Sequence, residues 1–267
     1  MTIDAARRRV LLQHHDGGGP VAIDVIAEGR GPALVMLPSS LRDSEDFDGV
    51  AAALAAAGHR VLRPQPRGMG GSRGALEGAS LHTLAGDVAA VIRQLGGGRA
   101  LIVGHAFGHY VARVAALDHT PLVRGVVVAA GAARSVPPGL AEALRIAADP
   151  AQPEAERLRQ LRLAFFAPGH DPRPWLAGWH PTLREAYRAA GLLPPKDAWW
   201  PTSTVPVLDL QAADDPWRPA ATRDELRAAL GERATVRVIA DASHALLPEQ
   251  PAAVVAAVVA WAAGLPP

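Results

Sequence analysis

The turn Gly104-His105-Ala106-Phe107-Gly108 is the segment whose residue types and spacing point most directly to chemistry. It follows a short apolar run that predicts a strand and precedes a run with helical spacing. A strand-to-helix turn this sharp strains its central residue and needs small neighbours, which the two glycines supply. The backbone N–H of Phe107, at a helix N-terminus, is positioned to donate to a developing oxyanion. The central Ala106, however, carries a methyl group that can neither attack a carbonyl nor lose a proton.

The elements around this turn alternate between strands and helices. Strand-like runs occur at 10–13, 21–27, 33–37, 61–62, 100–103, 125–130, 205–210 and 235–239, and helical patterns at 45–58, 81–95, 107–117, 222–230 and 251–263. The first two runs flank a Gly-rich turn and predict a hairpin. Because helices separate most later strands, the pattern predicts βαβ units and a mostly parallel sheet. Residues 135–203 are helical and interrupted by prolines, which predicts an insertion between two strands of that sheet.

Composition narrows the class of protein. The 267 residues carry 27 basic and 26 acidic side chains, a balance that argues against a nucleic-acid surface. The chain has no cysteine, which excludes disulfides, thiolate chemistry and Cys-based metal sites. Residues 251–264 form the longest apolar stretch, too short to span a bilayer, and we expect a buried terminal helix there. With no signal-peptide pattern at the start, we expect a single-domain cytoplasmic protein without a membrane partner.

Three segments before residue 110 resemble motifs of the α/β-hydrolase family. The turn at 104–108 matches the family's nucleophile elbow, small-x-nucleophile-x-small, with Ala106 at the nucleophile position. Leu37-Pro38-Ser39-Ser40 resembles the family's His-Gly-x oxyanion loop, which implies the Ser40 N–H as the second oxyanion donor beside that of Phe107. Gln65-Pro66-Arg67-Gly68-Met69-Gly70-Gly71-Ser72 resembles a structural turn, Asp-x-Arg-Gly-x-Gly-x-Ser, with Gln65 in place of Asp.

A fourth match lies late in the chain. Asp215, before Pro216, matches the family's acid position, with Asp214 as the second choice, and His244 matches its catalytic histidine. The order nucleophile, acid, histidine is the family's order. An aspartate that accepts from one imidazole nitrogen fixes the tautomer and stabilises the cation, so the resemblance implies a His244–Asp215 general base. The alternatives are a surface histidine after a strand and a turn aspartate before proline.

Ala106 leaves three interpretations open. In the first, the nucleophilic serine of an esterase was replaced by alanine to trap a ligand. In the second, the alanine is native and the His244–Asp215 pair activates water or substrate directly. In the third, the protein binds a ligand and catalyses no reaction. In the native case the reaction is hydrolysis, or proton abstraction leading to C–C cleavage or elimination. Ser39 or Ser40 as a substitute nucleophile is disfavoured, because neither lies on the strained turn.

The segment 135–203 is rich in aromatic residues that would pack it on the sheet or line an apolar pocket. His109 lies one helical turn from Ala106, where packing is the more frequent role. We place five side chains in the predicted substrate pocket: Ser39, Trp175, Trp179, Trp217 and His109.

The sequence therefore predicts an α/β fold with a doubly wound, mostly parallel sheet of about eight strands. Residues 135–203 would form a helical lid within a single domain, 1–267. The predicted function is an enzyme for a small, largely apolar or aromatic carbonyl substrate. No cofactor or metal is expected, because the base and the oxyanion donors are all protein groups. The expected partner is the substrate alone, with the chain a monomer or homodimer.

Overall fold

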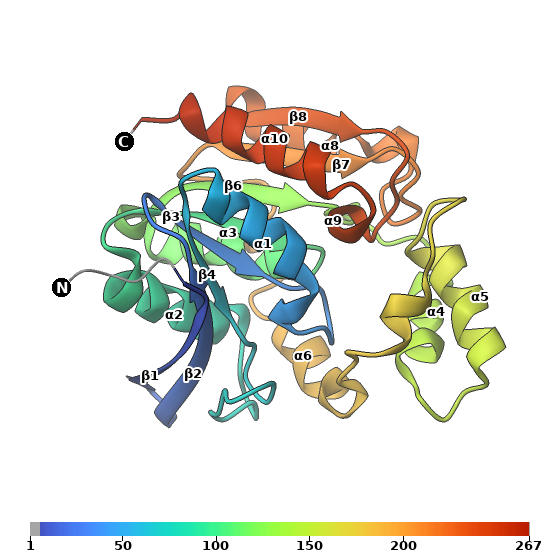
Figure 1. The fold of residues 1–267 in the computed structure, drawn as a ribbon, viewed down its shortest axis with the longest axis horizontal. Helices are drawn as coiled ribbons and strands as arrows, with labels where there is room; N and C mark the ends of the chain where they lie inside the picture. Colours follow the sequence, from blue (N-terminus) through green and yellow to red (C-terminus); the bar gives the residue numbers. More distant parts are fainter. Residues whose placement is uncertain (1–5, 267) are drawn as a thin grey trace.

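A single eight-stranded sheet organises the computed structural model, which describes residues 6–266 (Figure 1). Its spatial order is β1 (Arg8–Asp16), β2 (Gly19–Glu28), β4 (Arg60–Pro64), β3 (Ala33–Leu37), β5 (Ala100–His105), β6 (Val123–Ala129), β7 (Val207–Ala212) and β8 (Ala234–Ile239). Strands β1, β2 and β4 pair antiparallel, and every pairing from β4 to β8 is parallel. The predicted hairpin, the strand count and the mostly parallel sheet are confirmed.

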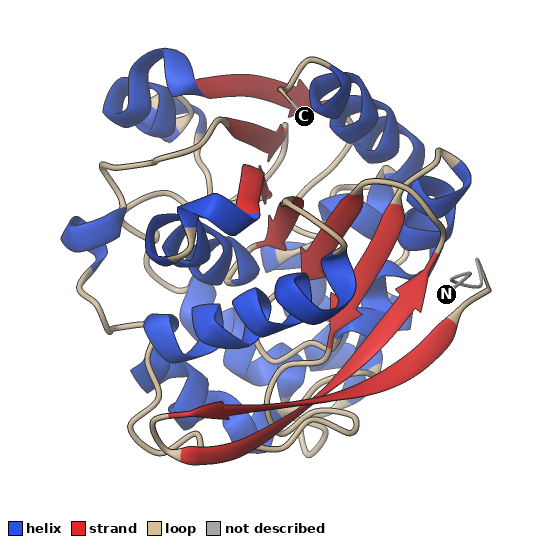
Figure 2. Ribbon diagram, turned by 90° about the vertical axis from the view of Figure 1, so that its left-hand side faces the viewer, coloured by secondary structure: helices blue, strands red, loops and turns tan. Residues whose placement is uncertain are grey.

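The central strands are buried on both faces, which explains their continuous apolar runs. In β3, Val35 and Leu37 belong to one core, whereas Leu34 and Met36 belong to another on the opposite face. Helices α2 (Leu81–Val91) and α3 (Gly108–Asp118) complete the first core, and α1 (Asp48–Ala56) and α10 (Pro251–Ala263) complete the second. Figure 2 shows helices on both faces of the twisted sheet.

The helices differ from the predicted ranges at their ends. The helix predicted at 45–58 starts as a 3₁₀ turn, η1 (Ser44–Phe47), and the one predicted at 81–95 ends in a π-turn, η2 (Ile92–Gly96). The helix predicted at 222–230 is a 3₁₀ turn, η6 (Ala220–Thr222), followed by α8 (Glu225–Leu230). The short α9 (Leu246–Glu249) was not predicted, because four residues show no helical period.

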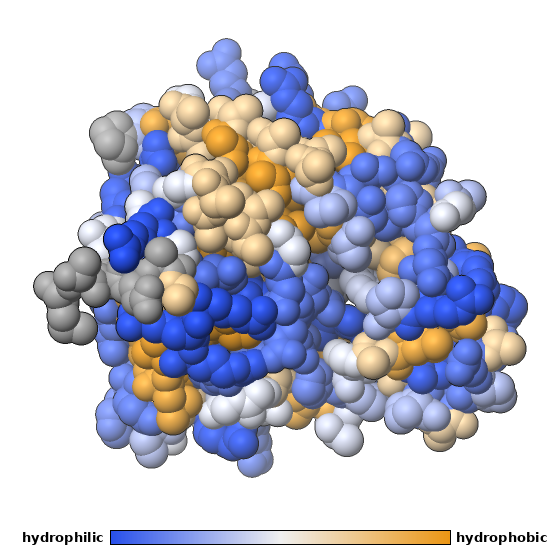
Figure 3. All heavy atoms as spheres, in the orientation of Figure 1, coloured by the Kyte–Doolittle hydropathy of each residue, from blue (hydrophilic) through white to orange (hydrophobic). Residues whose placement is uncertain are grey.

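The terminal helix α10 is less buried than predicted. Only Val254, Val258 and Ala262 are fully buried, one stripe at i, i+4 and i+8, and small alanines make up most of the outer face. Figure 3 shows the resulting apolar surface over this part of the molecule. Since alanine is apolar but small, a run of Ala and Val can look like a buried helix although only one stripe of it is buried. No helix within residues 6–266 is long and apolar enough to cross a membrane.

Residues 135–203 connect β6 to β7 and contain helices but no strand. They form α4 (Leu140–Ala148), α5 (Glu154–Ala164), η4 (Arg173–Leu176), η5 (Pro181–Leu183), α6 (Arg184–Ala190) and α7 (Lys196–Trp199). Figure 1 shows α4 and α5 together at one end of the molecule, whereas α6 lies below α1. A third apolar core joins Phe165 and Trp175 of this segment to Trp217 and Ala245 of two later loops. The segment thus packs on the loops that follow β7 and β8.

Candidate active site

The elbow between β5 and α3 holds its central residue in a left-handed backbone conformation. Ala106 has φ +46°, a region that L-residues rarely adopt. Its N–H donates to the Ala129 carbonyl at 3.0 Å, which continues the sheet into the turn. A Cβ at Gly104 would lie 2.4 Å from the His109 Cα, and a Cβ at Gly108 would lie 2.4 Å from the Leu37 oxygen. Only glycine fits at either position, so the helix start and the loop after β3 lie in direct contact.

The two late residues that the sequence paired lie side by side. His244 Nδ1 is 3.0 Å from Asp215 Oδ2 and 3.2 Å from Oδ1. Asp215 Oδ1 also accepts from the Trp217 N–H at 2.9 Å, and the Trp217 ring stacks on the imidazole with centroids 4.9 Å apart. Asp214, the alternative prediction for the acid position, is exposed, and its carboxylate has no hydrogen-bond partner among the described residues. Geometry therefore brings Asp215, not Asp214, to the histidine.

Two further side chains hold the loop that carries His244. His105 Nε2 donates to the His244 carbonyl at 2.7 Å, and complete burial lowers the pKa of His105 to about 3, so its ring is neutral. Glu249 accepts from the Ser243 N–H through one oxygen and from the Ala167 N–H through the other, both at 2.6 Å. The sequence analysis missed Glu249, because nothing in a four-residue helix marks a carboxylate that bonds to two distant backbone groups.

A cavity of about 180 Å³ brings the elbow and the histidine together. Neither His244 Nε2 nor the N–H groups of Ser40 and Phe107 have a hydrogen-bond partner within the described residues. The site thus offers one proton acceptor and two unsatisfied amide donors, and the methyl group of Ala106 lies on the wall of the same cavity. The cavity walls comprise Ser39, Ser40, Ala106, Phe107, Tyr110, Ala132, Val136, Leu144, Phe165, Trp217 and His244.

Three of the five predicted pocket residues lie elsewhere. Ser39 and Trp217 line the cavity, whereas Trp175 and Trp179 do not. The guanidinium of Arg42 lies 4.5 Å from the Trp175 ring centroid and 4.6 Å from the Trp179 centroid, so both rings make a cation–π contact outside this cavity lining. Composition alone could not have identified this arginine as their partner.

His109 is the third departure from the predicted pocket. It is completely buried among the rings of Tyr110, Trp199 and Trp200, and neither ring nitrogen has a hydrogen-bond partner in the described chain. Burial, with the nearby Arg113 charge, lowers its pKa well below the usual value. Tyr110 lines the cavity instead. The helical period could not separate the two residues, because positions three and four residues after Ala106 lie on the same helix face.

Comparison with known proteins places this geometry in context. A family model described as "Alpha/beta hydrolase family" matches residues 34–258. Epoxide hydrolase A from Mycobacterium tuberculosis is 41% identical over 87 residues, which is 32% of this chain and 26% of that protein, so the match spans about a quarter of the relative's length. An esterase from Exiguobacterium antarcticum superposes with a TM-score of 0.78 at 19% identity, covering 96% of this chain and 100% of the esterase.

A second solved structure agrees over the same extent. The protein Rv0554 from Mycobacterium tuberculosis superposes with a TM-score of 0.81 at 24% identity, over 97% of this chain and 100% of that one. At these identities the structural matches show the fold alone.

Proposed function

Because the chain belongs to the α/β-hydrolase family, we propose that it hydrolyses a small, largely apolar or aromatic carbonyl substrate without a covalent intermediate. In this proposal His244 is the general base and Asp215 holds its tautomer. The N–H groups of Ser40 and Phe107 form the oxyanion hole. Residues 135–203 form the lid.

One observation carries the proposal: His244, whose Nε2 has no hydrogen-bond partner among residues 6–266, lines the same cavity as the alanine of the elbow. In a serine hydrolase this nitrogen takes the proton of the serine hydroxyl. With a methyl group at residue 106, the space of that hydroxyl is open to a water molecule. The Asp215 carboxylate stabilises the imidazolium equally well whichever hydroxyl loses the proton.

The proposed reaction proceeds in two steps. Nε2 of His244 removes a proton from water as the water oxygen bonds to the carbonyl carbon, and the carbonyl oxygen becomes an oxyanion between the two amide donors. The intermediate then collapses, the bond to the leaving oxygen breaks, and the proton on Nε2 passes to that oxygen. General-base catalysis of this kind contributes about 10²–10⁴-fold, and each oxyanion donor contributes about 10²–10³-fold.

Three alternatives to this proposal differ in what the site does. If alanine stands in place of a serine, the same dyad would serve an acyl-enzyme esterase. If the cavity only binds, the chain would be a ligand-binding relic of the fold. A lyase that uses His244 to remove a substrate proton keeps the dyad without hydrolysis. The relative named Epoxide hydrolase A adds an epoxide to the substrates worth testing, because a base-activated water can open that ring as well.

The test compares the protein with its His244→Ala and Ala106→Ser variants on phenyl acetate, phenyl butyrate and styrene oxide. Turnover without a pre-steady-state burst, lowered by about 10²–10⁴-fold in His244→Ala, is the expected result. A burst and turnover confined to the Ala106→Ser variant would assign the serine-esterase alternative. Turnover that is unchanged in His244→Ala would overturn the proposal.

A further inference from the structure

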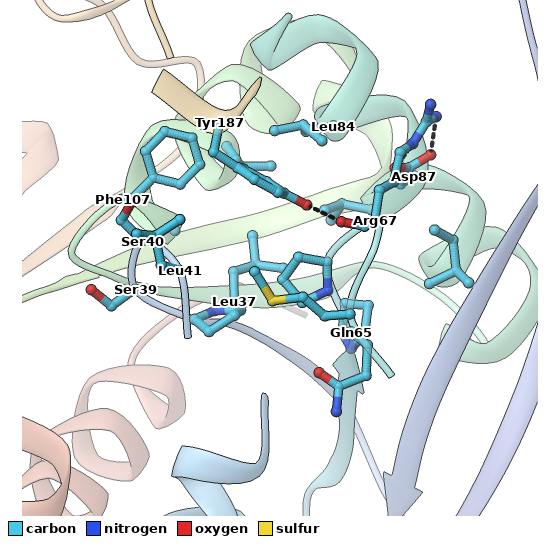
Figure 4. Close-up of a pocket in the computed structure, with 18 residues that line it drawn as sticks. Leu37, Ser39, Ser40, Leu41, Gln65, Arg67, Leu84, Asp87, Phe107 and Tyr187 are labelled. Carbon is cyan, nitrogen blue, oxygen red and sulfur yellow. Dashed lines mark hydrogen bonds and ion pairs between the residues drawn. The ribbon is translucent and has the colours of Figure 1, made fainter. Parts of the chain in front are cut away.

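A second cavity shares part of its wall with the reaction cavity. It has a volume of about 60 Å³ and lies beneath the loop after β3, between that loop, the turn after β4, and helices α2 and α3. Both cavities include Ser39, Ser40 and Phe107 in their linings. The two proposed oxyanion donors therefore stand at the junction of the two spaces. Figure 4 shows Phe107 and Ser40 on one side of this cavity, with Arg67 and Asp87 on the opposite side.

Most side chains that line this second cavity are apolar, and Gln65, Ser39 and Ser40 are the polar exceptions outside its far end. Ile23, Met69, Leu84, Val88 and Val111 are among the apolar ones. These side chains offer no hydrogen bond, and a cavity lined in this way favours an apolar occupant over water.

The polar groups at the far end are already satisfied by one another. Arg67 Nε lies 2.7 Å from Asp87 Oδ2, and the Tyr187 hydroxyl donates to the Arg67 carbonyl at 2.8 Å. His14 Nε2 is 2.8 Å from the other Asp87 oxygen. Because these charges are paired, the far end of the cavity has no unpaired charge that would attract a charged ligand.

Phe107 forms the partition between the two cavities. Its ring meets Tyr187 edge-on at a centroid distance of 6.0 Å, and a Cβ at Gly191 would lie 2.8 Å from its Cε2. Tyr110 approaches it to 5.7 Å on the reaction-cavity side. The ring is therefore fixed by neighbours in α3 and α6, so the partition has a defined position.

We propose that this second cavity is a side pocket for a short alkyl substituent, of about two to four carbons, on the substrate's carbonyl carbon. The assignment rests on the proposed function, since it puts the carbonyl oxygen at the N–H groups of Ser40 and Phe107. One substituent of that carbonyl then enters the side pocket, and the other stays in the larger reaction cavity.

The volumes decide which substituent goes where. One water needs roughly 10–15 Å³ and benzene fills a cavity of roughly 150 Å³. The side pocket, at about 60 Å³, is too small for an aromatic ring and large enough for a few carbons. The reaction cavity, at about 180 Å³, accommodates a ring. The substrate class is thus an aryl or bulky apolar group joined through a carbonyl to a short chain.

Binding of phenyl ketones tests the pocket without any turnover, because these probes have no bond to hydrolyse. Affinities for acetophenone, butyrophenone and hexanophenone would be measured by titration calorimetry. Burying a methylene gives about fourfold in affinity. We expect butyrophenone to bind about 15-fold more tightly than acetophenone, and hexanophenone to bind less tightly than butyrophenone.

A variant and a matched control locate the effect. Val88→Leu puts an extra methylene into the side pocket and should weaken butyrophenone about tenfold while acetophenone binds as before. Val91→Leu makes the same change at another buried position of α2, outside the pocket lining, and should leave both affinities unchanged. If Val88→Leu does not fold, Val88→Ala enlarges the pocket and should move the preferred ketone to hexanophenone.

Three results would overturn the assignment. The affinity is the same for all three ketones, none of the ketones binds, or Val88→Leu and Val91→Leu change the affinities equally. A different result would reject the proposed function alone. In that case the ketone preference would be as expected, but His244→Ala would leave the hydrolysis of phenyl butyrate unchanged.

Discussion

Two buried histidines lie close to the elbow, and they differ in almost everything except burial. His244 is 3% exposed and His109 is 0% exposed. His244 places Nδ1 on the Asp215 carboxylate and leaves Nε2 on the wall of a cavity. His109 has no hydrogen bond on either nitrogen within the described residues and lies among aromatic rings. The first is oriented and accessible, whereas the second is neither.

The contrast shows which features make an imidazole a candidate base. Proximity to the elbow does not suffice, because His109 is only three residues from Ala106. A carboxylate on one nitrogen fixes the tautomer and stabilises the cation, and the other nitrogen must reach the substrate. His109 has instead the Arg113 guanidinium nearby, and that charge lowers its pKa further.

The largest expected effect separates the two residues by activity. His244→Ala should lower kcat on the best phenyl ester by about 10²–10⁴-fold, because the proton acceptor is lost. His109→Leu, a matched removal of a buried imidazole, should change kcat by less than threefold. Equal losses in steady-state assays of the two variants would remove the distinction.

The carboxylate provides the next test. Asp215→Asn should lower kcat by up to about 10⁴-fold, because an amide no longer stabilises the imidazolium or selects the tautomer. Asp214→Asn, at the exposed neighbouring position, is the control and should retain wild-type kcat. If the Asp214 variant loses as much activity as the Asp215 variant, the pairing drawn from the geometry is wrong.

The aromatic neighbours of the two histidines should also differ in effect. Trp217 stacks on His244 with an interplanar angle of 25°, and a stacked pair contributes about 0.5–1.5 kcal/mol. Trp217→Leu should therefore lower kcat about twofold to tenfold. Trp199→Leu removes a ring beside His109 and should lower only the free energy of unfolding, as measured by urea denaturation.

The smallest effect concerns stability and its dependence on pH. Burial keeps the pKa of His109 well below that of the unfolded chain, so below about pH 6.5 the unfolded state binds a proton that the native state does not. Stability that is present above that pH is thus lost as the pH falls. His109→Leu should raise the free energy of unfolding by about 1 kcal/mol at pH 7, because it removes unpaired buried polar atoms.

The same variant should lessen the loss of stability between pH 6.5 and 5 by up to about 1.4 kcal/mol per pH unit. Urea denaturation at pH 7, 6 and 5 provides the measurement. A variant that loses stability with acid as steeply as the wild type would show that His109 is not the titrating group.

Much of the fold followed from local pattern. Continuous apolar runs such as 33–37 and 100–103 predicted the central strands, because strands buried on both faces have no polar side to alternate with. The glycines at 104 and 108 marked the elbow, where backbone contacts exclude any Cβ. The juxtaposition of His244 with Asp215 followed from motif order rather than from any local period.

The pocket was predicted less well, because its walls depend on contacts between distant segments. Trp175 and Trp179 were counted as pocket residues for their type, but Arg42, more than 130 positions away, binds their faces. Tyr110 was missed because the helical period puts it on the same face as His109. The side pocket beneath the loop after β3 left no trace in the sequence, since its lining comes from β2, β3, β4, α2, α3 and α6 and the loops between them.

Glu249 has a consequence for how this protein could be rebuilt. Its two carboxylate oxygens bond to Ser243, beside His244, and to Ala167, in the segment between β6 and β7. The Ala245 N–H adds a bond to the Phe165 carbonyl at 2.7 Å. The loop that carries His244 and residues 165–167 are therefore structurally coupled. A chimera that exchanges residues 135–203 alone keeps these bonds only if the new segment places a backbone N–H and a carbonyl at the same points, whereas one that also transplants residues 241–249 brings both sides of the contact.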